Sequence, residues 1–369
     1  QALAQVAKHG ARYISIFISM LAAHGALLFA QICWGSAAVT NKLGLSGAGI
    51  SPLLFAHLRE LCSLPVLFLI LRFGRHKDND QEKNVVQHHT WFVRLVPGVF
   101  IFVDQICSLI GNKLSGPVVA SAWQPSQVVF TILICVCFGL EEMTSSKALG
   151  ASFTFLGAAC LAFFQEDAHP DVHHGRRIGH LFFLTNCLAS SMEVILWRKL
   201  LQHATSSRAH FKVMSESYLV AAILTLCTNV VLSFSRTATN FLCKECDGNA
   251  WHVPEGAILS IAYSVVFQTI LAYCAQAWAL RRLESSIASL YAVAQPVVGI
   301  CLTVLLLWSG VHGHGDLTYP GWELIGVPLI IGGLVVVVIS SLREKSNTDL
   351  THKQDHVVEM QQTDLTYAF

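Results

Sequence analysis

Long apolar runs, each close to twenty residues, recur along the whole chain and are separated by short polar stretches. Within a run the apolar residues follow one another instead of alternating with polar ones, which favours helices over the strands of a membrane barrel. A helix of about 20 apolar residues crosses the hydrocarbon core of a bilayer. The ten predicted transmembrane helices are 24–44, 52–72, 94–112, 117–139, 147–165, 180–198, 213–234, 256–279, 286–308 and 321–341. The pattern therefore predicts an all-α membrane protein.

The composition supports the same conclusion. Hydrophobic residues make up 53% of the 369 positions and charged residues 13%, and the mean hydropathy is +0.54. A chain of this length and composition is too apolar for a soluble protein. The third run is the least regular, because Arg94 and Asp104 interrupt it.

The distribution of Lys and Arg among the predicted loops indicates the orientation. With the N-terminus in the cytoplasm, sixteen of these residues fall on the cytoplasmic side and five on the other. Because cytoplasmic loops carry the excess of basic residues, both termini are expected in the cytoplasm. Residues 1–23 then form a cytoplasmic or amphipathic segment before the first helix, and the polar residues 343–369 form a disordered cytoplasmic tail.

A repeated Gln-Pro pair divides the chain into two similar halves. When residues 124–125 are aligned with residues 295–296, "GASFTFLG" also falls on "GVPLIIGG" after a five-residue insertion in the second copy. Each copy has five helices, and this odd number of crossings gives the two copies opposite orientations in the membrane. Inverted repeats of this kind place a transporter's substrate site near the middle of the membrane, between the halves. The predicted parts are a first repeat at 24–165, a non-cytoplasmic linker at 166–179 and a second repeat at 180–342.

Both members of the Gln-Pro pair are unusual inside an apolar helix. Proline frees the backbone carbonyl four residues earlier, and glutamine brings two hydrogen-bond donors and an acceptor. In hydrocarbon these groups are costly unless a neighbouring helix, a water or a solute satisfies them. We interpret Gln124 and Gln295 as lining one pseudo-symmetric polar cavity. The alternative is that each glutamine only joins two helices by a hydrogen bond.

Further polar and aromatic residues are expected around this cavity. On the third helix, Asp104, Ser108 and Asn112 are four residues apart and share one face; on the eighth helix, Gln268 and Gln276 are eight residues apart and also share a face. Each of these two helices directly precedes the Gln-Pro helix of its half. The candidate solute-binding residues are Gln124, Gln295, Gln268, Gln276 and Asn112, flanked by Trp34, Trp123, Tyr273 and Tyr291.

Charged residues inside the apolar runs mark candidate functional sites, because burying a charge in a bilayer is costly. Arg59, Glu60 and Asp104 are in this position. If Arg59 reaches Asp104 across the bundle, the pair is structural; if Glu60 or Asp104 is unpaired, it becomes a candidate for proton coupling. Glu193 and Glu216 lie nearer the cytoplasmic ends of their helices, and surface ion pairing with nearby basic residues is the favoured interpretation for both.

Two clusters outside the apolar runs could carry other chemistry. Cys243 and Cys246 form a "CKEC" motif in a non-cytoplasmic loop, where a disulfide or a metal is conceivable. Histidines gather at 169–174 and at 312–314, where solvated loops are favoured over metal capture or pH sensing. No metal site is assigned.

Four stretches resemble the drug/metabolite transporter superfamily, of the ten-helix type with tandem EamA-like repeats. "FAQICWGSAAVTNKLGLSGAGISPLLFAHLRELCSLPVLF" and "DQICSLIGNKLSGPVVASAWQPSQVVFTILICVCFGLEE" resemble the first four helices of its plant drug/metabolite exporter branch, the walls-are-thin-related proteins. "GHLFFLTNCLASSMEVILWRKLL" and "LAYCAQAWALRRLESSIASLYAVAQPVVGI" resemble the sixth, eighth and ninth helices. The resemblance covers residues 24–341 and includes the acidic end of the fourth helix, here Glu141.

The second half departs from the family pattern after the ninth helix. Similar proteins carry an acidic residue there, whereas this chain reads "LLLWSGVHGHGDLTYP", in which only Asp316 is acidic. This difference concerns the residues that gate or couple transport at this end of the protein. The substrate of a family member is therefore not assigned to this chain. Branches of the family move amino acids, auxin-like and other small organic solutes, sugar-linked nucleotides and drugs.

The leading interpretation is a secondary transporter of small organic solutes, such as amino acids and related metabolites, that works by alternating access at a central cavity. The alternatives are a nucleotide-sugar or phosphorylated-metabolite antiporter, for which only Lys42 and Arg59 offer deep positive charge, and a divalent metal-ion transporter. An enzyme is not expected, because no HExxH, GxSxG or His-Asp set lies in the helices. Neither a cofactor nor a nucleic-acid partner is expected; the expected partners are a small solute and the bilayer. The plasma membrane is the default location, with endomembranes, plastid and vacuole as alternatives.

Overall fold

The computed structural model describes residues 2–73, 91–139, 144–163, 170–201, 207–280, 282–283, 288, 291–310, 317, 321–333, 335–336 and 339. All regular structure in these ranges is helical, as the apolar runs predict. The α-helices are α1 (Ala2–Lys42), α2 (Pro52–Phe73), α4 (Trp91–Ser115), α5 (Pro117–Trp123), α6 (Ser126–Cys137), α7 (Ser145–Phe163), α8 (Pro170–Leu201), α9 (Ser207–Ser233), α10 (Arg236–Leu242), α11 (Ile258–Tyr263), α12 (Ala272–Leu280) and α14 (Ala294–Trp308). The 3₁₀ and π segments are η1 (Leu43–Gly47), η2 (Lys244–Cys246), η3 (Glu255–Ala257), η4 (Ser264–Leu271), η5 (Tyr291–Val293) and η6 (Trp322–Ile325).

Eight stretches of the described chain are helical, long and apolar enough to cross a bilayer. Large apolar side chains are exposed on the outside of the bundle, for example Leu181, Val231 and Leu259, as expected for surfaces that contact lipid. The protein is therefore a multi-pass integral membrane protein. The eight spans are Ile18–Ser46, Pro52–Arg72, Leu95–Ser115, Pro117–Cys137, Arg177–Leu200, Phe211–Ser233, Glu255–Leu280 and Tyr291–Trp308.

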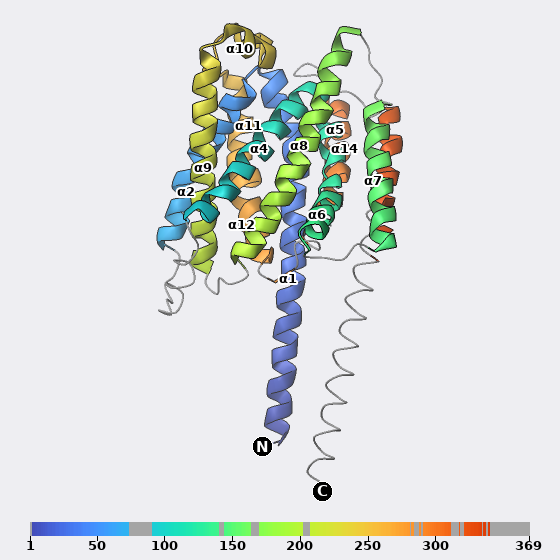
Figure 1. Ribbon diagram of the computed structural model, residues 1–369. Helices are drawn as coiled ribbons and strands as arrows, with labels where there is room; N and C mark the ends of the chain where they lie inside the picture. Colours follow the sequence, from blue (N-terminus) through green and yellow to red (C-terminus); the bar gives the residue numbers. More distant parts are fainter. Residues whose placement is uncertain are drawn as a thin grey trace.

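The two remaining expected helices lie side by side at one edge of the bundle. The fifth corresponds to α7, and the tenth begins at the helical residues 326–333 that follow η6. At Gly157 of α7 an added Cβ would come within 2.6 Å of the Gly326 carbonyl oxygen, so the two backbones nearly touch. Figure 1 shows α7 beside this last helix. The count of ten transmembrane helices, and the position of both termini in the cytoplasm, stay predictions.

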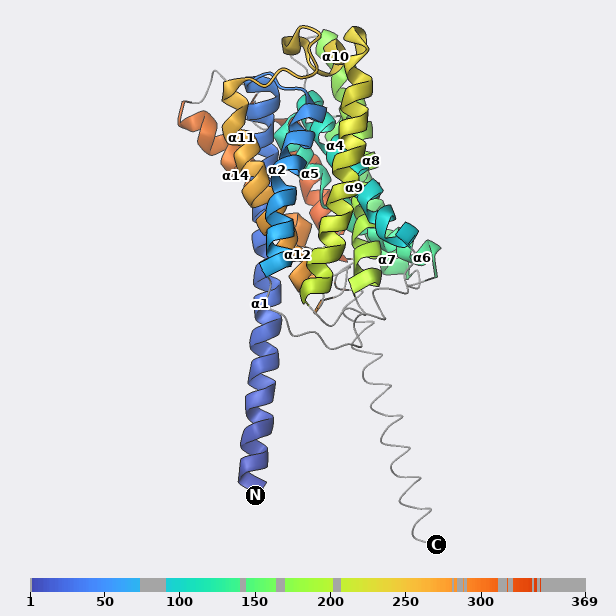
Figure 2. The same ribbon diagram turned by 90° about the vertical axis from the view of Figure 1, so that its left-hand side faces the viewer.

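The largest differences from the expected boundaries lie at the starts of α1 and α8. α1 begins at Ala2 and projects well beyond the bundle, so most of the expected N-terminal segment is continuous with the first span (Figure 2). α8 begins at Pro170, inside the expected linker, because proline is well suited to the first turn of a helix. Some of the expected features lie outside the described residues: 164–169, the tail from 340, Glu141, Asp316 and the histidines at 312–314. The side chains of 170–174 also lie outside them.

The two helices that carry the Gln-Pro pairs run in opposite directions. Ser121 of α5 lies against Gly299 of α14, whereas Val128 and Ile132 of α6 lie against Val293 at its beginning. Contacts that advance along one helix therefore move back along the other. Opposite directions are what an inverted repeat requires, although the repeat boundaries themselves stay predictions.

A short disulfide-bonded loop covers the end of the bundle opposite the N-terminus (Figure 1). Cys243 and Cys246 are bonded to each other, and their sulfur atoms lie 3.4 and 3.3 Å from the carbonyl oxygen of Gly49. Gly49 has a positive φ of 80°, and a Cβ there would come within 2.8 Å of the Glu245 side chain. Glu245 also pairs with Lys113 at the end of α4, at 3.3 Å. The loop thus contacts both the connection between η1 and α2 and the end of α4.

Candidate functional site

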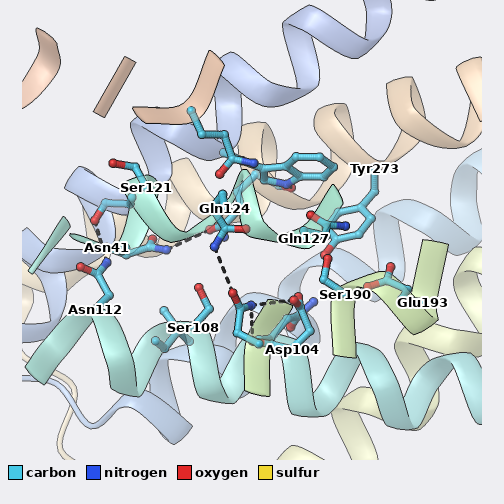
Figure 3. A pocket seen from close by; sticks show the side chains of 18 of the residues that line it. Asn41, Asp104, Ser108, Asn112, Ser121, Gln124, Gln127, Ser190, Glu193 and Tyr273 are labelled. Carbon is cyan, nitrogen blue, oxygen red and sulfur yellow. Dashed lines mark hydrogen bonds between the residues drawn. The ribbon is translucent and has the colours of Figure 1, made fainter. Parts of the chain in front are cut away.

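A polar cavity of about 80 Å³ lies in the middle of the bundle. Since one buried water needs about 10–15 Å³ of such space, the cavity has room for several waters or for part of a small solute. It is lined by α1, α2, α4, α5, α6, α8, η4, α12 and α14, which come from both halves of the chain (Figure 3). The polar and aromatic lining residues are Trp34, Asn41, Arg59, Asp104, Gln105, Ser108, Asn112, Ser121, Gln124, Gln127, Asn186, Ser190, Glu193, Gln268, Tyr273, Gln276 and Gln295.

The first Gln-Pro pair interrupts a span at the cavity. Gln124 and Pro125 form a turn between α5 and α6. Pro125 cannot donate to the Ser121 carbonyl four residues earlier, and the Gln124 backbone N–H donates to it instead, at 3.3 Å. The expected span over 117–139 is found as Pro117–Cys137, and this turn lies inside it. The interruption leaves the Gln124 side chain directed into the cavity (Figure 3).

A chain of hydrogen bonds runs from Gln124 to Asp104 along the cavity wall. Gln124 Nε2 donates to Asn186 Oδ1 at 3.0 Å, and Asn186 Nδ2 donates to Asp104 Oδ1 at 2.7 Å. Asn186 is 2% exposed and lies on α8, which packs along α4. One amide therefore satisfies two polar groups from different helices.

The second Gln-Pro pair occupies a different position in its helix. Gln295 and Pro296 lie in the first turn of α14, where a missing backbone N–H leaves no helical hydrogen bond unmade. Gln295 Nε2 donates to Gln31 Oε1 at 2.5 Å, and both side chains are buried. The two pairs therefore match in the sequence and in their approach to the cavity, but only the first one breaks a helix.

The π-helical segment η4 provides the next part of the wall. In an α-helix the Ala272 N–H would donate to the Gln268 carbonyl oxygen. Here it donates to the carbonyl oxygens of Phe267 and Thr269 instead. Trp34 Nε1 donates to the Gln268 carbonyl at 3.1 Å. The Gln268 side-chain oxygen accepts a hydrogen bond of 3.2 Å from Asn41. Irregular backbone at this depth is tolerated because side chains around the cavity satisfy it.

One interpretation of the intramembrane charges was an ion pair between Arg59 and Asp104. The contacts of the described residues do not include this ion pair. Arg59 is 1% exposed and its guanidinium donates to the side-chain oxygen of Gln105. Asp104 accepts from Asn186 instead. Glu60 is fully buried, has Thr225 of α9 beside it and does not line the cavity. Proton coupling through Asp104 or Glu60 stays a prediction.

Glu193 does not form the surface ion pair expected from the sequence. It is 3% exposed and lines the cavity, because Asn186, Ser190 and Glu193 are spaced by four and three residues and share the inner face of α8. The same expectation is right for Glu216, which pairs with Lys212 at 3.9 Å on the half-exposed side of α9.

The structure does not bring every expected residue to the cavity. The expected residues that line it are Trp34, Arg59, Asp104, Asn112, Gln124, Gln268, Tyr273, Gln276 and Gln295. Trp123 lies outside it, because its indole packs on Phe183 and donates to His180 Nδ1 at 2.9 Å. Tyr291 also lies outside, and its hydroxyl forms a hydrogen bond with His24 Nδ1 at 2.7 Å.

Several lining residues were not expected from the sequence. Two of them, Asn186 and Ser190, carried a usable signal, which is their helical spacing with Glu193 in a predicted transmembrane helix. Ser121 and Gln127 lie three residues before and after Gln124, and this spacing was also available from the sequence. The unexpected lining residues are Asn41, Gln105, Ser121, Gln127, Asn186, Ser190 and Glu193. Within the described residues, no three His, Cys, Asp or Glu side chains are grouped as metal ligands.

A multi-pass helical bundle with a polar chamber at its centre is the architecture of a membrane transporter. The family comparison agrees, because residues 21–163 match the EamA-like transporter family. The chain thus contains an EamA domain, of the drug/metabolite transporter superfamily. Transport of small solutes is the general function that this domain match supports.

Two curated relatives and one solved structure are similar over most of the chain. A WAT1-related protein of Arabidopsis thaliana is 20% identical over 80% of this chain and 81% of its own. A probable amino-acid metabolite efflux pump of Escherichia coli (strain K12) is 24% identical over 84% of this chain and 93% of its own. One crystal structure, at 16% identity, superposes with a TM-score of 0.54 and covers 87% of this chain and 97% of its own, which supports the fold alone.

Proposed function

We propose that the protein is a secondary carrier that moves a small polar organic solute through the central cavity by alternating access. The observation that carries the proposal is the cavity itself, which is enclosed by helices of both halves and lined by amide, hydroxyl and charged side chains. A polar chamber in hydrocarbon is costly to maintain unless water or a solute occupies it. Opposed movement of the two halves would open it to each side in turn.

The proposed binding residues are the side-chain amides around the cavity. Gln124, Gln268 and Gln295 each approach it from a different helix, and an amide both donates and accepts hydrogen bonds. Such a lining suits small metabolites with several polar groups, amino acids among them. The E. coli relative named as an amino-acid metabolite efflux pump supports this substrate range.

The lining gives less support to a nucleotide-sugar or phosphorylated-metabolite antiporter. A phosphate group would need deep positive charge. Arg59 is the one basic residue among the described lining residues, and its guanidinium already donates to Gln105. The Lys42 ammonium donates to the Lys113 carbonyl oxygen, near the disulfide-bonded end of the bundle.

Counterflow in proteoliposomes tests the carrier proposal. Vesicles that contain the purified protein are loaded with an unlabelled pool of amino acids, organic acids, nucleosides and nucleotide sugars, and entry of each labelled member is followed. Accumulation of one class is expected. Gln295→Leu should reduce it more than tenfold with no loss of folded protein, because the variant removes a cavity amide.

The matched control is Val297→Leu, which changes an exposed position two residues further along α14 and should leave counterflow unchanged. Counterflow that survives Gln295→Leu would remove this glutamine from solute binding. If folded protein accumulates no labelled solute of any class, the carrier proposal fails for these compounds.

A further inference from the structure

We propose that Glu193 binds a positively charged nitrogen of the transported solute, so that the cavity selects small protonated amines over neutral or anionic analogues of the same shape. This inference rests on the proposed carrier function and names its substrate class. It is carried by the contacts of Glu193, by the charges around the cavity and by the position of the aromatic rings.

Glu193 is the lining carboxylate that lacks a partner. It is 3% exposed, and no hydrogen bond or ion pair joins it to another described residue. Asp104, by contrast, accepts a hydrogen bond of 2.7 Å from Asn186. A buried carboxylate without a partner is strongly unfavourable, and a cation in the cavity would relieve this cost.

The charges around the cavity also favour a cationic solute. Asp104 and Glu193 line the cavity, buried Glu60 lies outside the lining but near the charge of Arg59, and Arg59 is the one basic residue in the described lining. The Arg59 guanidinium is held by Gln105, which in turn donates to Tyr218 at 3.2 Å. Arg59 can therefore balance one of the three carboxylates, and the remainder must be balanced by protons or by a cation.

Aromatic rings surround the same end of the cavity. Tyr273 lies at the centre of the group, with edge-on contacts to Trp34 at 5.2 Å, Tyr218 at 5.3 Å and Trp197 at 5.9 Å between ring centroids. Both Tyr273 and Trp34 line the cavity. The faces of aromatic rings attract ammonium groups, and more strongly where water is excluded. A carboxylate beside such rings suits a protonated amine better than a hydrated metal ion.

The opposite end of the cavity is neutral. Figure 3 shows Glu193, Ser190 and Tyr273 on one side, and Asn41 and Asn112 on the other. The amide side chains at that end can donate to and accept from an uncharged polar group. The two ends therefore define an orientation, with the ammonium group at Glu193 and the rest of a small solute directed towards the asparagines.

Thermal unfolding of the purified full-length protein in detergent tests the assignment with four probes at equal concentration. The probes are butylammonium chloride, butanol, sodium butanoate and potassium chloride, which keep the chain length and change the charge or the kind of cation. A ligand that binds the folded protein raises the unfolding temperature. We expect a rise with butylammonium alone. Equal effects of all four probes, an effect of butanoate or potassium ions alone, or no effect of any would overturn the proposal.

Glu193→Gln identifies the carboxylate responsible, with Glu216→Gln as the matched control on the half-exposed side of α9. Butylammonium should bind Glu193→Gln roughly ten- to hundredfold more weakly, since a hydrogen bond to a charged group is lost. Glu216→Gln should bind it as the wild type does. Undiminished binding by Glu193→Gln would overturn the assignment. If Glu193→Gln does not fold, the four-probe comparison on the wild type still decides whether the cavity selects the amine.

This result is separable from the carrier proposal. If proteoliposomes exchange neutral or anionic solutes while butylammonium neither binds nor competes, the carrier stands and the amine assignment fails. If butylammonium binds through Glu193 but no solute crosses the vesicle membrane, the binding site stands and the carrier fails.

Discussion

At the scale of single residues, one buried amide holds together polar groups that reach the cavity from different segments of the chain. Asn186 receives a hydrogen bond from Gln124 and gives one to Asp104, so three helices meet at one amide. Its second bond, to the Asp104 carbonyl oxygen at 3.0 Å, uses the same nitrogen. Removing this amide would take a hydrogen-bond partner from Gln124 and another from Asp104.

We therefore expect Asn186→Leu to destabilise the protein by about 1–3 kcal/mol for each polar group that it leaves unsatisfied. The measurement is thermal or denaturant unfolding of the purified protein in detergent. Thr185→Val is the matched control, because Thr185 is exposed and its hydroxyl bonds only to the Leu181 carbonyl oxygen of its own helix. Equal stability of Asn186→Leu and the control would show that the hydrogen-bonded chain contributes nothing.

The sequence predicted the residues whose polarity was repeated or periodic. Gln124 and Gln295 could be found because they occur in both halves, and Asp104 and Asn112 because they share a face. Trp123 and Tyr291 were misplaced because an aromatic ring that flanks a polar residue in sequence can turn to either side of its helix. The basic residues that follow Glu193 favour the surface, although its spacing with Asn186 indicates the inner face.

At the scale of the helices, close approach depends on the absence of a side chain at a few positions. A Cβ at Gly35 of α1 would come within 2.8 Å of the Gln295 carbonyl oxygen and 3.0 Å of the Val298 side chain on α14. Small residues let helix backbones approach closely in membranes, where van der Waals contact replaces the hydrophobic effect as a driving force. The same contact involves the backbone of Gln295, whose side chain lines the cavity.

Gly35→Ala should therefore separate α1 from α14 and lower both the unfolding temperature and the rate of solute exchange. Gly25→Ala on the same helix is the control, since no atom lies within 4 Å of an added Cβ there. The control should be neutral or slightly more stable, because alanine favours a helix over glycine by roughly 1 kcal/mol. The measurements are the unfolding temperature and the counterflow rate of both variants. A Gly35→Ala protein with the same values as Gly25→Ala would contradict the close contact between α1 and α14.

The apolar runs predicted where the spans lie but not the irregularities within them. The break at Gln124 could have been expected from Pro125, yet Pro65 and Pro97 lie inside helices that continue. The outcome depends on whether a neighbouring group can take the freed carbonyl, and that depends on tertiary contacts. The π-helical turn η4 likewise has no proline or glycine to mark it in the sequence.

At the scale of the whole molecule, the disulfide-bonded loop and the N-terminus lie at opposite ends of the bundle (Figure 1). The excess of basic residues predicts the N-terminal side in the cytoplasm. Cys243 and Cys246 would then face the outside, where disulfides persist. The loop thus links the orientation of the protein to a chemical property that can be measured on intact cells.

A membrane-impermeant maleimide should label this loop on intact cells only after treatment with a reductant. The Cys243→Ser/Cys246→Ser double variant is the control and should lose that labelling. Labelling before reduction would argue against the disulfide, and labelling that requires permeabilised cells would reverse the predicted orientation. Mass spectrometry of the labelled peptide distinguishes these cysteines from the ten free ones.

The π-helical turn at Ser264–Leu271 also affects how this chain is compared with its relatives. A turn closed by bonds over five residues holds one residue more than a turn closed over four. A relative with an ordinary α-helix at this point would therefore be one residue shorter, and an ungapped alignment would pair Tyr273 and Gln276 with positions about 100° away around the helix. Placing a single gap inside residues 264–271 restores the correspondence between cavity-facing positions.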